Sequence, residues 1–134
     1  MQDQKEVWDK IAASWNEHRT KVTSEAYDFL KDETGKILDI GCGSGRNFLS
    51  YPMQELYAID FSFEMIKLAK ENAKKKGIDV ELSVMNATNL RFEENFFDAV
   101  LCNAVLHCIP SREDRINVLS EIFRVLKKIG RAHV

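Results

Sequence analysis

Three glycines at alternate positions, Gly41, Gly43 and Gly45, are the residues of this chain best placed to do chemistry. They follow the short apolar stretch 37–40, which has the composition of a buried parallel strand. A buried strand that ends at a glycine-rich turn is how doubly wound α/β domains form a nucleotide pocket. Asp39, within that strand, puts a carboxylate beside the turn. The pattern therefore predicts a nucleotide site at the end of this strand.

The glycine spacing and the nearby carboxylate narrow the choice of nucleotide. A Walker-type phosphate loop requires G-x-x-x-x-G-K-[ST], which the sequence lacks, and a dinucleotide site favours G-x-G-x-x-G over the G-x-G-x-G present here. A carboxylate at Asp39 would repel a pyrophosphate and attract a cation. S-adenosylmethionine (SAM) carries an α-ammonium and a sulfonium and has no phosphate. We therefore favour SAM, with a NAD-type oxidoreductase as the disfavoured alternative.

A second carboxylate, Asp60, follows the apolar stretch 56–59, about 20 positions after Gly41. An acid at this separation accepts hydrogen bonds from both ribose hydroxyls of an adenosine. Dinucleotide and SAM sites share this feature, so Asp60 supports adenosine without choosing between them. The alternative roles are structural: Asp60 would cap a helix, and Asp39 would hold the loop amides.

Hydrophobic periodicity places the glycine turn in an alternation of helices and strands. Apolar residues recur at helical spacing through the opening segment, and Ser or Thr caps mark later helices. The expected elements are helices at about 3–17, 24–34, 46–51, 62–76 and 111–127, and strands at about 37–40, 56–59, 80–84 and 97–102.

These elements predict an α/β fold: a Rossmann-like, doubly wound, mostly parallel sheet with N-terminal helices. About four strands are expected, in the order 3-2-1-4, and the later strands of such a sheet are missing from the pattern. In the last helix, we expect Ile116, Leu119, Phe123 and Leu126 to face a core.

Composition bounds the remaining function classes. The 134 residues have room for one domain, and a hydrophobic content of 45% excludes disorder. The net charge of −2 gives no general attraction to nucleic acid or anionic membranes. No apolar run is long enough to span a membrane. Three cysteines without metal-ligand spacing indicate a reduced, cytoplasmic setting, and we expect no metal site.

An ordered series of motifs resembles the class I SAM-dependent methyltransferases, from the start of the chain to about Lys127. One glycine turn alone is a weak signal, whereas the whole series at the family's spacing is specific. The matching segments are 37–45 (ILDIGCGSG), 57–62 (YAIDFS), 86–92 (NATNLRF), 97–100 (FDAV), 104–107 (AVLH) and 122–127 (IFRVLK).

The resemblance implies SAM as the cofactor and assigns its parts to these motifs. The glycine turn would line the methionine part with Asp39 behind it, Asp60 would bind the ribose, and residues 61 and 65 would lie against the adenine. Family members often carry Asp-Ala where this chain has Asn86-Ala87, and Asn86 can still accept a hydrogen bond from the adenine amino group. The cofactor-binding residues that the resemblance implies are Arg19, Asp39, Gly41, Cys42, Gly43, Gly45, Asp60, Phe61, Met65, Asn86, Ala87 and Asn103.

The residues after the strand at 97–102, which include Asn103, Ala104 and His107, are expected to face the transferred methyl group. His107 is a weak candidate for a general base, and packing or shaping of the acceptor pocket is the favoured alternative. The cysteines at 102 and 108 are expected to be small core residues, and that at 42 to fit the turn by its size, without a redox role.

The opening segment 7–19 (VWDKIAASWNEHR) resembles the start of the methyltransferases that act on carboxymethyl-uridine at the tRNA wobble position. This implies that Arg19 pairs with the SAM carboxylate, as suits a guanidinium; a solvated surface arginine is the alternative. Similar openings occur in small-molecule methyltransferases, and the sequence shows no obvious basic surface for tRNA. The acceptor, at O, N or C, stays open between a modified tRNA uridine and a small molecule. A non-catalytic SAM-fold subunit, or an activator subunit as partner, is also open.

The end of the chain departs from the family pattern. Family domains continue past the last helix with a Pro-Gly-Gly turn and three further strands, whereas here Lys127-Lys128 leads into IGRAHV at 129–134. We expect residues 1–127 to be the N-terminal SAM-binding part of one methyltransferase domain, truncated at its C-terminus, and residues 128–134 to be a non-native tail. An unfinished sheet exposes an apolar edge, so we expect the chain on its own to be inactive or unstable.

Overall fold

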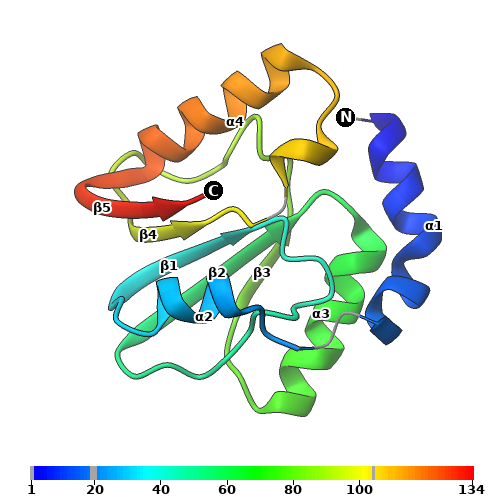
Figure 1. Cartoon of the computed structure of the whole chain (residues 1–134), viewed down its shortest axis with the longest axis horizontal. Coiled ribbons are helices and arrows are strands. Elements are labelled where there is room, and N and C mark those ends of the chain that lie inside the picture. Colours follow the sequence, from blue (N-terminus) through cyan, green and yellow to red (C-terminus); the bar gives the residue numbers. More distant parts are fainter. Residues whose placement is uncertain (1, 19–20, 104) are drawn as a thin grey trace.

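A five-stranded parallel sheet forms the centre of the computed structural model, which describes residues 2–18, 21–103 and 105–134 (Figure 1). The elements are α1 (Gln2–His18), α2 (Ser24–Leu30), β1 (Gly35–Ile40), β2 (Gln54–Asp60), α3 (Phe63–Lys76), β3 (Glu81–Val84), β4 (Phe97–Leu101), the 3-10 turn η1 (Leu106–Cys108), α4 (Arg112–Val125) and β5 (Leu126–His133).

The strand order is β3-β2-β1-β4-β5, and the neighbouring strands are parallel. The Rossmann-like α/β prediction is therefore confirmed, including the order of the first four strands. β1 lies in the middle and pairs with β2 along its whole length and with β4 on its other side. The carboxyl ends of β1, β2 and β4 thus meet at one edge of the sheet, where the glycine turn begins.

β5 is an element that the sequence did not predict. The helix expected to reach residue 127 ends at Val125, and the chain continues directly as a strand beside β4. Residues 131–133 align with residues 99–101 of β4. This pairing satisfies backbone groups that β4 would otherwise expose at a sheet edge. Because the side chains of β5 are half-buried or exposed, its sequence lacks the apolar run by which the other strands were found.

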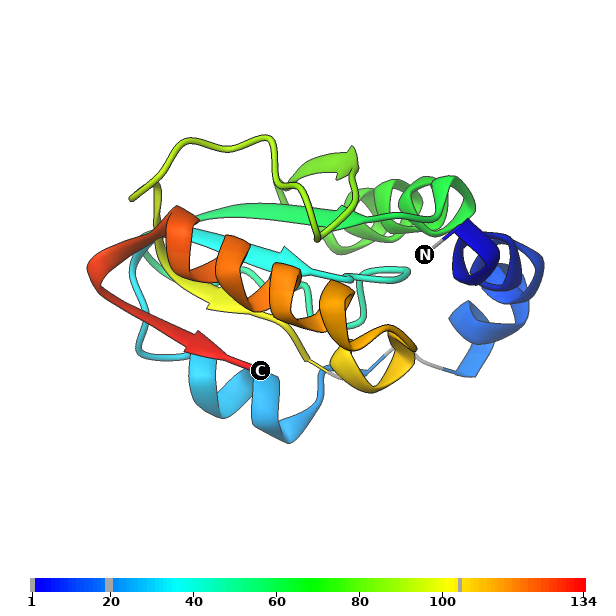
Figure 2. The same ribbon diagram turned by 90° about the horizontal axis from the view of Figure 1, so that it is seen from above.

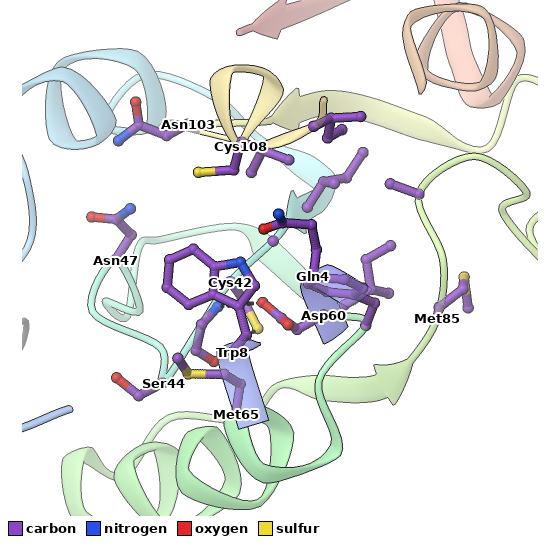
Figure 3. A pocket seen from close by; sticks show the side chains of 18 of the residues that line it. Gln4, Trp8, Cys42, Ser44, Asn47, Asp60, Met65, Met85, Asn103 and Cys108 are labelled. Carbon is purple, nitrogen blue, oxygen red and sulfur yellow. Dashed lines mark hydrogen bonds between the residues drawn. The ribbon is translucent and has the colours of Figure 1, made fainter. Parts of the chain in front are cut away.

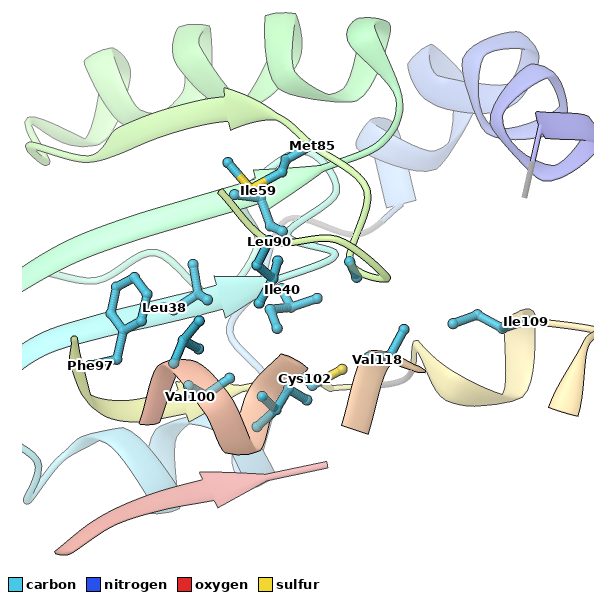
Figure 4. Packing of buried hydrophobic residues seen from close by; sticks show 13 residues of the cluster. Leu38, Ile40, Ile59, Met85, Leu90, Phe97, Val100, Cys102, Ile109 and Val118 are labelled. Atoms are coloured by element: carbon cyan, nitrogen blue, oxygen red, sulfur yellow. The ribbon is translucent and has the colours of Figure 1, made fainter. Parts of the chain in front are cut away.

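Different helices cover the two faces of the sheet (Figures 1 and 2). α4 packs over the face that carries Leu38 and Val100 (Figure 4). α2 packs against the opposite face, with Ile37 and Leu101, and α3 packs beside it against Ala58. Successive strand residues point to opposite faces, so each strand contributes to both layers. This two-sided burial explains the nearly continuous apolar runs of β1 and β4.

α4 turns a different face to the sheet from the one expected. Ile116, Leu119 and Phe123 are 52%, 44% and 84% exposed, so their prediction as core residues is wrong. The helix carries two apolar stripes, and periodicity alone does not say which stripe meets the sheet. The stripe that is buried consists of Val118, Ile122 and Val125.

The connection between β1 and β2 contains turns where a short helix was expected. Residue 41 and residues 43–47 form turns, and every residue of this connection is described. The three glycines of the turn have φ angles of 67°, 56° and 87°. Positive φ angles are incompatible with a right-handed helix, so the backbone at 41–45 cannot begin one, and the chain continues in turns to residue 47 along the edge of the sheet.

Candidate functional site

A cavity of about 280 Å³ lies at the carboxyl ends of β1, β2 and β4 (Figure 3). Residues of α1, of the turn after β1, of the start of α3 and of the segment after β4 form its walls. Ligands of open α/β sheets bind at this position, outside the carboxyl ends of the strands where the strand order reverses. The predicted site residues that line the cavity are Gly41, Cys42, Gly43, Asp60, Phe61, Met65, Ala87, Asn103 and His107.

Asp60, at the end of β2, is oriented by two backbone amides. The Gly43 N–H donates to Oδ2 at 2.9 Å, and the Ser62 N–H donates to Oδ1 at 2.9 Å. Burial raises the pKa of Asp60, and these backbone hydrogen bonds act in the opposite direction. Because a carboxylate offers about four lone-pair sites, each oxygen can still accept a hydrogen bond from a ligand hydroxyl.

The turn after β1 depends on glycine at its first position. Gly41 has a φ of 67°, and a Cβ added to it would lie 2.4 Å from Cγ2 of Val105. That conformation and that approach exclude a side chain. Two residues later, the amide of Gly43 makes the hydrogen bond to Asp60. The turn therefore joins the ends of β1 and β2 and presents its backbone to the cavity.

Asp39 is buried next to the turn and is not among the residues that line the cavity. Burial, together with repulsion from the charge of Asp60, raises the pKa of Asp39 to about 8. The carboxyl group is therefore mostly protonated at neutral pH. The sequence predicts a negative charge at Asp39, whereas in the structure this carboxyl group is largely neutral.

Thr23, the N-cap of α2, connects three segments that are distant in sequence. Its N–H donates to Oδ1 of Asn47 at 3.0 Å, and Nδ2 of Asn103 donates to its Oγ1 at 3.3 Å. Arg46 is fixed nearby, because its Nε donates to the carbonyl oxygen of Lys21 at 3.0 Å. These contacts hold the glycine turn, the start of α2 and the loop after β4 together around the cavity.

Three other predicted cofactor residues are not part of the described wall. Asn86 is exposed, and its Oδ1 accepts hydrogen bonds from the N–H (2.9 Å) and Oγ1 (2.7 Å) of Thr88, so it shapes the loop after β3. Gly45 approaches the ring of Phe48, away from the lining. Arg19 lies outside the residues that the structure describes.

The thiols in and beside the cavity stay protonated. Burial, with the charges of nearby carboxylates, raises the pKa of Cys42 well above its usual range. Burial likewise raises the pKa of Cys102 to about 12. Neither group is a thiolate nucleophile at neutral pH. His107 is exposed and lines the cavity, while Ala104, expected beside it, lies outside the described residues.

Sequence reasoning missed several residues of the wall. Arg46 and Asn47 line the cavity, and their position directly after the glycine turn was a usable signal. Gln4 and Trp8 of α1 also line it (Figure 3). For Trp8, helical periodicity indicated only an apolar face and did not say which surface that face would cover.

Two negative findings apply to the described parts of the chain. There, no group of three His, Cys, Asp or Glu side chains is arranged to hold a metal ion. In the same ranges, no helix is long and apolar enough to cross a membrane.

A family model described as a methyltransferase domain matches residues 38–134, which include the glycine turn, Asp60 and the loop after β4. The chain belongs to the methyltransferase domain family. The predicted methyltransferase family is thereby confirmed, and the AdoHcy-bound relative described below supports SAM as its cofactor.

Relatives of this methyltransferase domain act on different acceptors according to their names. This chain is 30% identical over 126 residues to a tRNA (carboxymethyluridine(34)-5-O)-methyltransferase of Arabidopsis thaliana. The aligned region covers 92% of this chain and 30% of that protein. This chain is also 31% identical over 144 residues to a demethylmenaquinone methyltransferase of Lactococcus lactis. That aligned region covers 94% of this chain and 55% of that protein. The chain thus spans about half or less of the length of these relatives.

A solved structure supports the same family. PKMT2 from Rickettsia typhi, in complex with AdoHcy (S-adenosylhomocysteine), matches with a TM-score of 0.66 and 32% identity. The match covers 74% of this chain and 20% of that chain.

Proposed function

We propose that this methyltransferase domain binds SAM in the cavity between α1, the glycine turn and α3, and presents its methyl group to an oxygen, nitrogen or carbon acceptor. The observation that carries the proposal is Asp60. Its carboxylate is buried at the end of β2, is oriented by two amides, and lines a cavity at the position where α/β sheets bind ligands. This arrangement suits the two hydroxyls of a ribose.

The rest of the lining divides by chemistry into two ends. Phe61, Met65 and Ala87 supply apolar surface that suits an adenine ring. At the glycine turn, the guanidinium of Arg46 has further N–H donors besides the Nε that is already bonded. Those donors suit the carboxylate of the methionine part, so Arg46 joins Arg19 as a candidate for this pairing.

The G-x-G-x-G spacing and the match to a methyltransferase domain support SAM over a NAD-type ligand. Asp39 and Asp60 lie at the ends of adjacent strands, and the turn between them carries no phosphate-loop lysine. Asp60 does not choose between the two ligands, because dinucleotide sites also carry an acid at this position, and Asp39 is largely protonated at neutral pH.

Methyl transfer from a sulfonium is an in-line displacement, so its rate depends on holding the acceptor near the methyl group. We assign that side of the cavity to the segment after β4, which contributes Asn103, His107 and Cys108 to the wall. His107 there acts either as a general base or by shaping the acceptor pocket. Exchange of His107 for Asn, which keeps a polar side chain, separates these roles by the pH profile of transfer.

For the acceptor, we propose a modified tRNA uridine, with a small apolar molecule as the second candidate. The opening segment and the Arabidopsis relative support tRNA. The Lactococcus relative and a net charge of −2 support the small molecule. Two arrangements with a partner protein belong to the same proposal. In one, a partner subunit activates this domain. In the other, this domain is a non-catalytic SAM-fold subunit of a catalytic partner.

Calorimetric titration with SAM, S-adenosylhomocysteine and NAD tests the site. Wild-type protein is expected to bind the first two and not NAD. Asp60→Asn should weaken SAM binding at least tenfold, because hydrogen bonds to a charged group are worth about 1.5–3 kcal/mol each. Asp79→Asn, an equal change of charge at an exposed loop residue, is the matched control and should bind as wild type. Binding of NAD instead of SAM would refute the proposal.

Transfer of a radiolabelled methyl group tests the acceptor. Label in tRNA supports the first candidate, and label in a demethylated quinone supports the second. If this protein transfers the methyl group without a partner protein, the hypothesis that it is a non-catalytic subunit is excluded.

A further inference from the structure

The carboxylate of Asp9 joins α1 to the start of α3. It accepts a hydrogen bond from Oγ of Ser62 and, at 3.4 Å, one from the N–H of Glu64, while its other oxygen accepts from Nζ of Lys5 at 2.8 Å. Ser62 is the N-cap of α3, and its Oγ also accepts from the N–H of Met65 at 3.2 Å. Asp9 therefore places a negative charge at the positive end of a 14-residue helix, where it is stabilising.

Apolar packing of α1 is slight in the part whose side chains are described. Val7 and Ile11 are 48% and 38% exposed, whereas Ala12 is buried. A helix with few buried apolar contacts has a low free energy of local opening. Within residues 4–12, the hydrogen bonds of Asp9 to Ser62 and Glu64 therefore give α1 a specific attachment to α3, beside the half-buried Trp8.

The inner side of α1 forms a wall of the cavity. Trp8, next to Asp9 in the sequence, and Gln4, about one helical turn earlier, line the cavity together with Asp60 and Met65 (Figure 3). Ser62 also donates its N–H to Asp60. The residue that holds Asp9 is thus the residue that orients the carboxylate proposed to bind the ribose.

We propose that Asp9 is a positioning residue of the SAM site: its hydrogen bonds to Ser62 and Glu64 hold α1 closed over the cofactor, with Trp8 against it. The inference rests on the proposed SAM site. Cofactor release then requires α1 to detach from α3, so the strength of the Asp9 contact sets the exchange rate. Steps of this kind limit turnover in many enzymes.

Fluorescence of Trp8 provides the test. The chain has two tryptophans, so Trp15→Phe leaves Trp8 as the single reporter. S-adenosylhomocysteine is expected to change its emission, and displacement by excess SAM in a stopped-flow instrument gives the release rate. In this background, Asp9→Asn should speed release about tenfold, since a charge-assisted hydrogen bond is lost. The melting temperature should fall little, because the described apolar side chains near Asp9 on α1, Val7 and Ile11, are largely exposed.

The matched control is Glu6→Gln, an exposed residue of the same helix with the same change of charge. It should release the ligand as slowly as the Trp15→Phe parent. A double-mutant cycle with Ser62→Ala separates the contact from the capping role of Ser62. If Asp9 acts through Ser62, Asp9→Asn should speed release less in the Ser62→Ala background than alone.

Two results would overturn the inference, and they differ from failure of the site itself. If Asp9→Asn releases ligand like Glu6→Gln while Asp60→Asn still weakens binding, the site is correct and the role of Asp9 is wrong. Unchanged Trp8 emission on ligand binding would likewise refute closure of α1. If SAM does not bind, or binds Asp60→Asn normally, the proposed site and the role of Asp9 fall together.

Discussion

Burial gives different roles to the two carboxyl groups beside the glycine turn. Asp60 receives amide hydrogen bonds from both sides and lines the cavity. Asp39, from the neighbouring strand, is held away from the lining, and its pKa of about 8 keeps it largely protonated at neutral pH. The same residue type is thus a cavity-lining carboxyl group at the end of one strand and a largely protonated core group in the neighbouring strand.

The raised pKa of Asp39 predicts a pH-dependent loss of stability. An aspartate of pKa near 3.8 in the unfolded chain and about 8 in the fold is ionised only in the unfolded state between these values. The free energy of unfolding therefore falls as pH rises from about 4 to 8, by about 1.4 kcal/mol per pH unit, and is level above 8. Asp39→Asn lacks this slope, so its advantage over wild type should grow from pH 5 to 8. Urea unfolding at several pH values measures it, and parallel curves would contradict it.

Two helices, α4 and α1, carry apolar residues that do not face the core. α4 has one apolar stripe on the sheet and a second that stays exposed. α1 exposes part of its apolar face and turns Trp8 to the cavity. Periodicity identified both as helices, but only their neighbours in space decided which side each presents.

Alanine substitutions in α4 distinguish its two stripes. Val118→Ala removes buried methyl groups under the helix and should lower the free energy of unfolding by about 2 kcal/mol. Phe123→Ala removes a larger side chain, but one that is 84% exposed, and should change it by less than about 0.5 kcal/mol. Chemical denaturation measures both. A larger cost for Phe123 would mean that its stripe is covered in solution.

β5 includes most of the residues that the sequence assigned to a tail outside the domain. The division into a SAM-binding part, 1–127, and a non-native tail, 128–134, stays a prediction. In the structure these last residues extend the sheet, and Arg131 makes an ion pair with Glu33 at 3.0 Å.

The cavity is a property of the whole molecule, because α1, the glycine turn, the start of α3 and the loop after β4 all contribute to it. A ligand that binds there stabilises every element that the wall connects. At a SAM concentration of 100 times Kd, the free energy of unfolding should rise by about 2.7 kcal/mol, which corresponds to roughly 10 °C in Tm. Differential scanning fluorimetry measures the shift. NAD at equal concentration serves as the negative control, and an equal shift with NAD would contradict the prediction.

The sequence by itself determined the sheet of β1 to β4, the glycine turn, Asp60 and the family, because short apolar runs, glycine spacing and caps act over a few residues. Only the tertiary structure decided the pairing of β5, the buried face of α4, the neutral state of Asp39 and the places of Trp8, Arg46 and Asn47 in the wall. Each of these depends on residues far along the chain. β5 pairs with β4, and α4 packs on the sheet. Asp39 is neutral because it is buried and lies near Asp60, Trp8 is placed by the contact of α1 with α3, and Arg46 and Asn47 are held by residues 21 and 23. Local sequence patterns do not indicate such distant neighbours. The glycine turn could therefore be predicted from the sequence, whereas the residues that enclose the cavity beside it could not.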